Sequence, residues 1–229
     1  MKKSWWNIAS VALKVLCVAL LTFTIVGGLL REVPRLNIVN ESIRGLYFHV
    51  PMWFGMITMF LVSFISAIRY LLKPSAEKDI YSVEFAHVGV AYGMLGTLTG
   101  MIWANYTWGS PWHGDVKQNM SAISMLIYFA YFVLRGSVAN DEQRARLSAV
   151  YNIFAFVAMI PLLFIVPRMF SSLHPGNGGN PGFNMYDLHS TMRPVFYCAC
   201  VGWILLAGWI ATLRVRIRII SEKLADQNV

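Results

Sequence analysis

The residues of this sequence best suited to chemistry are its five histidines, His49, His87, His113, His174 and His189. A neutral imidazole nitrogen is a good ligand for iron and other transition metals. One histidine lies in the stretch WGSPWHGD, residues 108–115, where two tryptophans, two glycines and a carboxylate fall within eight residues. Glycine lets a backbone approach a flat ligand closely, and a carboxylate among aromatic side chains needs a partner. Together these residues favour a flat, metal-centred ligand, provided that the fold brings them to one place.

The elements that must position these residues are membrane helices. Hydrophobic residues make up 57% of the chain and charged residues only 13%, against about 25% charged in an average soluble domain. A transmembrane helix needs about 20 apolar residues. The six segments that satisfy this are Ala9–Leu30, Val50–Leu72, Phe85–Trp103, Ser121–Val138, Leu147–Val166 and Pro194–Leu213. We therefore predict an all-α integral membrane protein, a six-transmembrane-helix bundle that forms a single membrane domain over residues 1–229.

Positive charge predicts the orientation of these helices, because Lys and Arg favour the cytoplasmic side of a membrane. Thirteen of the 19 Lys and Arg residues fall on the side of the two termini. The other six are Arg31, Arg35, Arg44, Lys117, Arg168 and Arg193. This bias predicts that both termini are cytoplasmic and that residues 104–120 form an external, tryptophan-rich loop. Every histidine except His87 then lies at the outer membrane face.

Each of these signals also has a plainer interpretation. An interfacial histidine such as His49 commonly reaches for water, and His174 follows a helix end where an exposed loop histidine is ordinary. The tryptophans of WGSPWHGD are compatible with the aromatic belt that marks a membrane interface. For His87, with Glu84 three residues earlier on the helix, a helix-packing role or an interfacial hydrogen bond is the default. The ligand hypothesis gains its strength from the shared side of four histidines.

Small residues and prolines shape the predicted bundle. The third span has one face of bare glycines, which let a neighbouring helix approach closely; they are Gly89, Gly93, Gly96 and Gly100. This face packs either inside the bundle or against a partner subunit. Pro161 and Pro167 are expected to kink the outer half of the fifth span. The three cysteines all lie inside spans and are expected to be packing residues. The sequence carries no phosphate-binding GxxxxGK[ST] loop and no CxxCH haem-attachment motif.

The WGSPWHGD stretch, which is followed by a basic residue at position 117, resembles the tryptophan-rich "WWD" signature of haem-handling proteins. That signature reads approximately WGxWWxWD, with a basic residue two positions after the aspartate. Three other segments, RGLYFHVPMWF, SSLHPG and HSTMRP, are similar, in the same order, to segments of the haem exporter protein C (CcmC) family of cytochrome c maturation. The resemblance therefore covers nearly the whole chain.

The resemblance implies a set of site residues. His49 and His174 match the two axial haem ligands of the family, so haem iron is the metal that they would bind. The matches to the haem-contacting loop are Trp108, Gly109, Trp112 and Asp115. The signature has further tryptophans where this chain has Pro111 and Gly114, which implies a smaller aromatic platform. Three additional candidates for ligation or contact are His113, Lys117 and His189.

The same resemblance implies a function. The protein would bind haem b non-covalently at the outer face of the bacterial inner (cytoplasmic) membrane and pass it to a membrane-anchored haem chaperone. ABC-type ATPase and permease subunits would supply the energy, in agreement with the missing phosphate loop. The implied role is haem delivery within a lipid bilayer, without enzymatic activity and without nucleic acid. The GNGGNPG run, residues 176–182, is expected to let His174 move during release, because glycine and asparagine keep a backbone adaptable.

Other functions are compatible with the sequence. A CcsA-type cytochrome c synthetase core shares the tryptophan signature and would be an enzyme, although such proteins usually have more spans and further histidines within the bundle. A structural membrane subunit or permease that binds no haem would use the glycine face and an aromatic belt equally well. A b-type electron-transfer cytochrome ranks last, because it needs histidine pairs buried within helices and only His87 qualifies.

Overall fold

A computed structural model describes residues 2–35, 38–174 and 188–227. Its elements are α1 (Lys2–Leu30), the 3-10 helix η1 (Asn40–Gly45), α2 (Leu46–Leu72), α3 (Ala76–Trp108), α4 (Val116–Ser137), α5 (Asp141–Ile160), the π-helix η2 (Pro161–Ile165), α6 (Val166–Met169) and α7 (Arg193–Gln227). Six helical stretches of this part of the chain are long and apolar enough to cross a membrane. The predicted six-helix membrane bundle is therefore confirmed.

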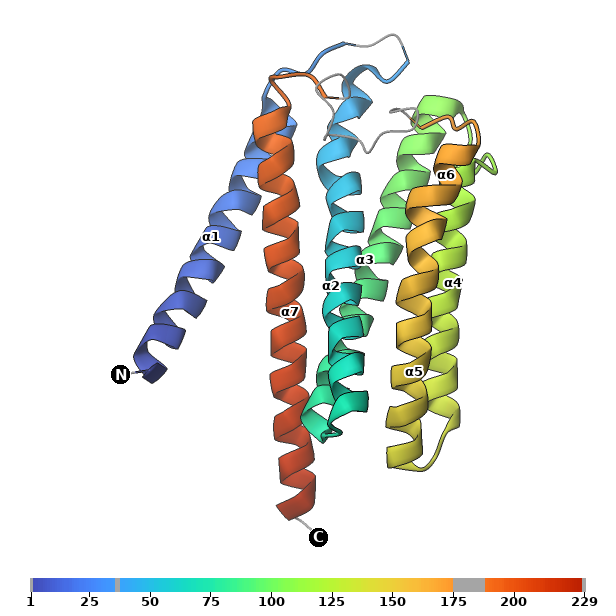
Figure 1. The fold of residues 1–229 in the computed structure, drawn as a ribbon. Coiled ribbons are helices and arrows are strands. Elements are labelled where there is room, and N and C mark those ends of the chain that lie inside the picture. Colours follow the sequence, from blue (N-terminus) through green and yellow to red (C-terminus); the bar gives the residue numbers. More distant parts are fainter. Residues whose placement is uncertain (1, 36–37, 175–187, 228–229) are drawn as a thin grey trace.

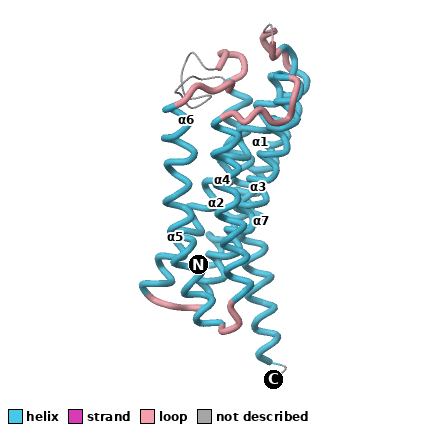
Figure 2. Tube along the Cα trace, turned by 90° about the vertical axis from the view of Figure 1, so that its right-hand side faces the viewer, coloured by secondary structure: helices cyan, strands magenta, loops and turns pink. Residues whose placement is uncertain are grey.

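The helices lie side by side along one common direction (Figure 1). The start of α1 and the end of α7 lie at one end of the bundle, which we call the terminal end. The opposite end, the loop end, carries the end of α1, the start of α2, the connection between α3 and α4, the helix α6 and the start of α7. Figure 2 shows the same division from a second direction. Residues 49, 108–115 and 174 all lie toward the loop end.

Local sequence accounts for the ends of α3, which is longer than the predicted span Phe85–Trp103. The helix begins after Ser75, whose hydroxyl accepts a hydrogen bond from the N–H of Lys78 at 3.4 Å. Acidic residues in the first turn favour a helix start, although they lower the hydropathy of the segment. The helix ends at Gly109, which has the left-handed φ of +80° that glycine adopts without strain. The polar first turns are thus helical without being apolar.

Proline changes the course of the chain at the loop end of the fifth span. The α-helical pattern of α5 stops at Pro161, which has no N–H to donate, and continues as the π-helix η2. Pro167 lies at the start of the short helix α6. The two prolines that were expected to disturb this half of the span therefore lie where the α-helix gives way to η2 and α6. This arrangement leads the chain to His174.

Helix α2 lies in the middle of the bundle and packs against α3, α5 and α7, whereas α1 packs against α7 at one edge. The glycine face of α3 is turned toward α2. A Cβ atom added at Gly89 would lie 2.5 Å from the ring of Phe60, and one added at Gly96 would lie 2.9 Å from the ring of Trp53. The glycine face therefore packs inside the bundle, which resolves the two alternatives left by its spacing.

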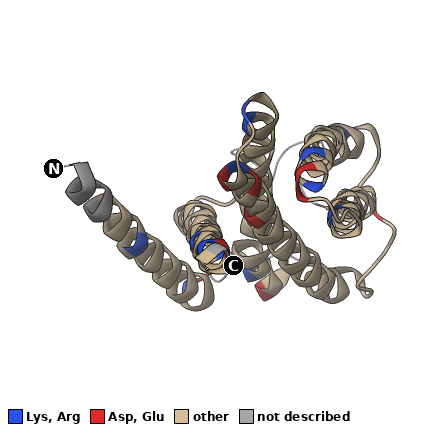
Figure 3. Ribbon diagram, turned by 90° about the horizontal axis from the view of Figure 1, so that it is seen from below, with Lys and Arg blue, Asp and Glu red and all other residues tan. Residues whose placement is uncertain are grey.

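Ion pairs tie helices together in the half of the bundle nearer the terminal end, from which Figure 3 is viewed. Arg135 of α4 donates two hydrogen bonds to Asp79 of α3, at 2.8 and 2.5 Å. Arg214 of α7 donates to Glu84 of α3 at 2.7 Å. The Nδ1 atom of His87 lies 3.7 Å from the same Glu84 carboxylate. His87 therefore belongs to this structural cluster, far along α3 from the loop end.

Candidate functional site

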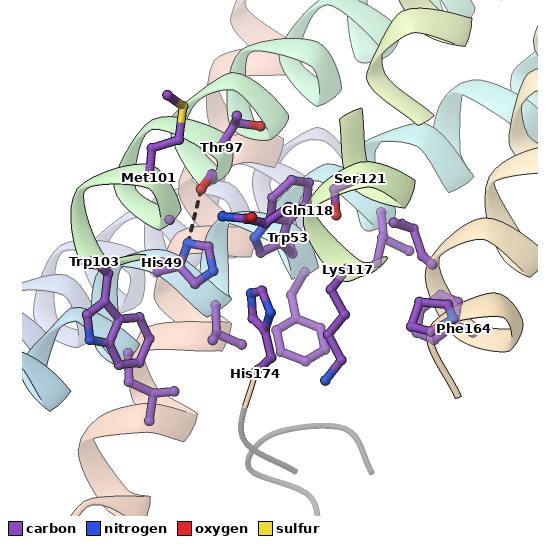
Figure 4. Close-up of a pocket in the computed structure, with 18 of the residues that line it drawn as sticks. His49, Trp53, Thr97, Met101, Trp103, Lys117, Gln118, Ser121, Phe164 and His174 are labelled. Carbon is purple, nitrogen blue, oxygen red and sulfur yellow. Dashed lines mark hydrogen bonds between the residues drawn. The ribbon is translucent and has the colours of Figure 1, made fainter. Parts of the chain in front are cut away.

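A cavity opens at the loop end between α2, α3, α4 and the η2–α6 segment. Both His49, from α2, and His174, which follows α6, line this cavity, and both point into it in Figure 4. Its other walls are largely apolar and aromatic. The large rings among the lining residues are Trp53, Phe54, Trp103, Trp112 and Phe164. The structure thus brings together two histidines that are 125 positions apart in the sequence.

The ring of His49 is held by the backbone of α3. Its Nδ1 atom lies 3.0 Å from the carbonyl oxygen of Gly96 and 3.3 Å from the hydroxyl of Thr99. A carbonyl oxygen only accepts hydrogen bonds, so Nδ1 carries the proton and donates it. The other ring nitrogen, Nε2, then bears the lone pair that a metal requires.

The ring of His49 occupies space that is free because Gly100 has no side chain. A Cβ atom added at Gly100 would lie only 2.6 Å from Cε1 of His49, closer than Cβ contacts in real proteins. Two indoles flank the ring edge-on, Trp53 at 6.1 Å and Trp103 at 5.9 Å between ring centroids. His49 is therefore seated by helix packing on several sides.

The ring of His174 is held by a carboxylate. Its Nδ1 atom lies 2.9 Å from Oδ1 of Asp115, and about a quarter of its side chain (26%) is exposed. An ionised carboxylate only accepts, so the neutral ring donates from Nδ1 and again leaves Nε2 with the lone pair. The indole of Trp108 packs edge-on against the same ring, with 5.0 Å between centroids.

Asp115 organises the loop end through several hydrogen bonds. Besides His174, its carboxylate accepts from the N–H of Leu173 at 2.7 Å, the hydroxyl of Ser172 at 3.2 Å and the N–H of Lys117 at 2.9 Å. The last bond caps the N-terminus of α4. Burial by itself would raise the pKa of Asp115, but these hydrogen bonds and nearby His174 lower it below 3.8. Asp115 is therefore a permanent carboxylate that joins α4 to the segment of His174.

The protonation of His174 follows from the same surroundings. Burial lowers the pKa of its imidazole below 6.5, with a further lowering from the charge of Lys117 and an opposing effect from Asp115. The ring is accordingly neutral at neutral pH. A neutral imidazole with a fixed Nδ1–H is the form in which histidine ligates a metal.

The remaining predicted residues divide between the cavity and its surroundings. Trp112 and Lys117 line the cavity, whereas Gly109 forms the left-handed end of α3. His113 is exposed; its ring packs edge-on against Trp108 at 6.0 Å, and it is not among the described lining residues. His189 is also exposed, and its Nδ1 lies 2.9 Å from the hydroxyl of Thr191. The GNGGNPG run lies outside the described residues.

Several residues of the site were missed in the sequence. Trp53 comes four residues after His49, a spacing that puts both on one helix face, so the signal was present. The sequence predicts that Gly100 is a packing glycine, but it does not show that the ring packed against Gly100 is that of His49. Gln118 lines the cavity and fixes the tryptophan stretch, since it donates to the carbonyl of Pro111 at 3.2 Å and accepts from the N–H of His113 at 3.0 Å. Arg168, at the end of the fifth span, had no signal beyond its charge.

The side chains that could ligate a metal at this site indicate whether it suits a bare metal ion or a metal complex. Among the described residues, no group of three or more His, Cys, Asp or Glu side chains is placed to hold a bare metal ion. Two imidazoles in an aromatic cavity instead suit a metal whose other ligands belong to a flat organic molecule, as in haem. The fold and the site thus define a class, a multi-pass helical membrane protein with a two-histidine, tryptophan-lined cavity at one end.

Comparison with known proteins identifies the family. A profile of "Heme exporter protein C" matches residues 2–229, so the chain belongs to the haem exporter protein C (CcmC) family. It is similar to Heme exporter protein C of Paracoccus denitrificans, with 24% identity over 188 residues that cover 81% of this chain and 77% of the relative. The protein of the same name from Bradyrhizobium diazoefficiens is 25% identical over 59% of this chain and 51% of its own length.

A shorter similarity extends to a second group. Cytochrome c biogenesis protein CcsA of Prochlorococcus marinus is 39% identical over 80 residues, which are 35% of this chain and 26% of that protein. The shared segment is therefore local, whereas the match to the haem exporter family covers almost the whole chain. This protein is a multi-pass membrane protein with a haem-handling role in cytochrome c biogenesis, and its family is named for the export of haem and not for a catalytic activity.

Proposed function

We propose that this protein binds haem b non-covalently in the loop-end cavity, with His49 and His174 as the two axial ligands of the iron. The observation that carries this proposal is the hydrogen bonding of the two rings. Each donates its Nδ1–H to a fixed acceptor, and both line one cavity with Nε2 as the remaining ligand atom. Metal-ligating histidines typically have this second partner.

The tryptophan stretch has divided roles in this proposal. Trp112 forms part of the wall against which the porphyrin packs, and Trp108 supports the ring of His174. Gly109 turns the chain at the end of α3. Asp115 acts through His174 and the start of α4. The stretch thus supports haem contact by some residues and positioning by others. Residues 104–120 act as the external haem-contacting segment, although only residues 109–115 of it form a loop between α3 and α4.

The cavity lies at the outer face of the bacterial inner membrane in this proposal, and both termini of the single membrane domain are cytoplasmic. The excess of Lys and Arg on the side of the termini supports this orientation. Haem is cargo here: it is passed to a membrane-anchored haem chaperone without chemical change. ABC-type ATPase and permease subunits are the proposed partners, as the resemblance to the haem exporter family implies, and a sequence without a phosphate-binding loop agrees with this.

The local similarity to CcsA supports one competing function, a cytochrome c synthetase core. The two functions differ in what they need from other proteins. Co-expression with an apocytochrome and a synthetase partner, but without a haem chaperone, separates them. Delivery predicts no covalent haem on the apocytochrome in that strain, whereas synthetase activity predicts covalent attachment.

The direct test of the site is spectroscopic. The purified protein should show the Soret band and reduced α-band of low-spin haem with two histidine ligands. His49→Ala and His174→Ala should each lose this spectrum and most of the bound haem, whereas His113→Ala and His189→Ala should keep both. If both ligand variants retain wild-type haem content and a bis-histidine spectrum, the assignment is wrong.

A further inference from the structure

The loop between α3 and α4 is fixed by amide side chains from the first turn of α4. Gln118, the third residue of that helix, lines the cavity and is 9% exposed (Figure 4). Its side chain donates to the carbonyl oxygen of Pro111 at 3.2 Å and accepts a hydrogen bond from the N–H of His113 at 3.0 Å. A carbonyl only accepts and an N–H only donates, so each end of the amide has a matching partner. Gln118 therefore bonds to the backbone on both sides of Trp112.

The next residue of α4 extends this bonding. Asn119 donates from Nδ2 to the carbonyl oxygen of Gly114 at 2.9 Å. The two carbonyls that accept these amide hydrogen bonds thus belong to Pro111 and Gly114, the positions at which this chain lacks the tryptophans of the signature. Gly114 has a φ of +68°, which a tryptophan rarely adopts, and a Cβ atom added there would meet nothing within 4 Å. Hydrogen bonds from α4, and not rings at these two positions, therefore set the course of the loop.

The two tryptophans that the stretch retains are held in different ways. Trp108, the last residue of α3, packs edge-on against the rings of His113 and His174. Trp112 lines the cavity but is 38% exposed. Its backbone is bonded to Ser110, whose hydroxyl donates to the carbonyl of Trp112 at 3.1 Å and accepts from its N–H at 3.4 Å. The position of the Trp112 indole therefore depends on the course of the surrounding backbone.

We propose that Gln118 is a positioning residue for haem, which holds Trp112 in the cavity wall through the backbone on either side of it, with Asn119 in a supporting role. This inference rests on the proposed function, because it concerns the same cavity. It deepens that function by assigning to a neutral side-chain amide the fixing of a loop from which two aromatic rings are absent.

Loss of the amide should affect the loop more than the fold. Pro111 and His113 are exposed, so water can take over the two backbone hydrogen bonds when Gln118 is replaced. Asp115 still caps the N-terminus of α4. The helix should therefore keep its start, while the loop loses its fixed course.

Haem titration of the full-length protein in detergent tests the role. Gln118→Leu, which removes both hydrogen-bonding groups, should weaken haem binding about fivefold, the effect of about one neutral hydrogen bond. At saturating haem it should keep the bis-histidine spectrum, because both histidines are intact. The matched control is Gln143→Leu, since Gln143 is the third residue of α5 and is exposed at the terminal end. This control should bind haem like the wild type. Unchanged affinity in Gln118→Leu overturns the inference.

A double-mutant cycle distinguishes positioning of Trp112 from a general loosening of the protein. Trp112→Ala alone should weaken haem binding, and adding Gln118→Leu to it should cause little further loss, because the ring that Gln118 positions is already gone. In a Trp108→Ala background, by contrast, Gln118→Leu should keep its full effect. Additive losses of affinity in the cycle with Trp112 overturn the inference.

Amide hydrogen exchange of the haem-free protein gives a readout that does not depend on haem. A peptide that covers residues 109–115 should exchange faster in Gln118→Leu than in the wild type, because the N–H of His113 has lost its acceptor. Gln143→Leu should leave this exchange unchanged. Equal exchange in Gln118→Leu and the wild type overturns the inference whether or not haem binds. If the exchange differs but the wild type binds no haem, the proposed function fails, and the role of Gln118 in positioning haem fails with it.

Discussion

The two proposed iron ligands lie in regions of opposite construction. His49 is part of the continuous helix α2, where a neutral backbone carbonyl accepts a hydrogen bond from its Nδ1–H and a glycine of α3 makes room for its ring. His174 lies after α6, where the buried carboxylate of Asp115 accepts a hydrogen bond from its Nδ1–H. One ligand is fixed by the packing of two long helices, and the other by a polar network at the surface of the bundle.

This difference suggests how one site can both hold and release a ligand. A carboxylate partner increases the basicity of an imidazole, so His174 is expected to be the stronger donor to iron. Its network nevertheless involves only the start of α4 and the segment after α6, and it includes no contact between two long helices. His49 cannot move without disturbing the α2–α3 contact. We expect His174 to leave the iron first during delivery.

Among the variants that keep both histidines, the largest expected effect comes from Asp115→Asn, which removes the charge of the acceptor but nearly keeps its size. Loss of such a partner typically lowers metal affinity about 10- to 100-fold. We expect a loss of this size for haem, together with a shift from a six-coordinate low-spin to a five-coordinate spectrum. Haem titration and absorption spectra measure both. Asp141→Asn, at the start of α5 near the terminal end, is the control and should bind normally. Normal binding by Asp115→Asn would contradict the positioning role.

The next effect is the dependence of haem binding on pH. Because the pKa of His174 in the folded protein lies below 6.5, its ring is neutral above pH 6.5 and contributes fully to haem binding there. This contribution is lost as the pH falls through the pKa of the folded protein. Below that pKa, haem affinity should fall about tenfold per pH unit, since one proton competes with iron. Asp115 raises the pKa of His174, so Asp115→Asn should move the inflection to lower pH. An inflection that moves to higher pH would refute this account.

A smaller effect is expected on the other side of the iron. Gly100→Ala places a Cβ atom 2.6 Å from Cε1 of His49, so the ring must shift. Overpacking costs about 1–3 kcal/mol, and if it falls on the ligand ring it should appear as a loss of about tenfold in haem affinity.

Two other glycines provide the controls for this substitution. Gly89→Ala creates an equally close contact, 2.5 Å from the ring of Phe60, and should lower thermal stability without changing the haem spectrum. Gly136→Ala meets nothing within 4 Å and should change neither property. If Gly100→Ala and Gly89→Ala have the same effect on the spectrum, the glycine face acts on the fold as a whole and not on His49.

The smallest effect is expected for Thr99→Val. The hydroxyl of Thr99 is the longer of the two contacts of His49 Nδ1, 3.3 Å against 3.0 Å for the Gly96 carbonyl. Because the Gly96 carbonyl still accepts the hydrogen bond from Nδ1–H, haem affinity should change by less than about threefold, which corresponds to the loss of a weak neutral hydrogen bond. A loss as large as that of Asp115→Asn would show that both ligands depend on a polar side chain, and the contrast between the two regions would disappear.

The sequence was sufficient to predict the membrane helices, because apolar stretches of this length have few other structures available to them. It did not predict the true ends of α3 and α7, whose polar turns continue the helix beyond the apolar segment. It also placed four histidines on one side of the membrane, but a membrane face is a plane, and sharing it does not make residues neighbours. His113 and His189 lie at the loop end without lining the described cavity.

The pairing of Asp115 with His174 is the part of the site that sequence reasoning does not reach. The two residues are 59 positions apart in the sequence, since Asp115 precedes α4 and His174 follows α6. Their contact depends on the route that η2 and α6 impose on the chain, and a π-helical segment has no reliable sequence signal apart from its proline. Gly100 shows the opposite case: its small size was visible in the sequence, and only its partner required the structure.

The origin of the cavity lining has a consequence for biosynthesis. The described lining residues come from α2, α3, the connection between α3 and α4, α4, η2, α6 and the segment of His174, and none comes from α1 or α7. A nascent chain inserted helix by helix therefore has all of these wall residues before α7 is made. At about 5–20 residues per second, synthesis from His174 to the end of α7 takes several seconds. Helix α7 packs against α2 and α3. It therefore joins the bundle after all residues that line the cavity have been synthesised.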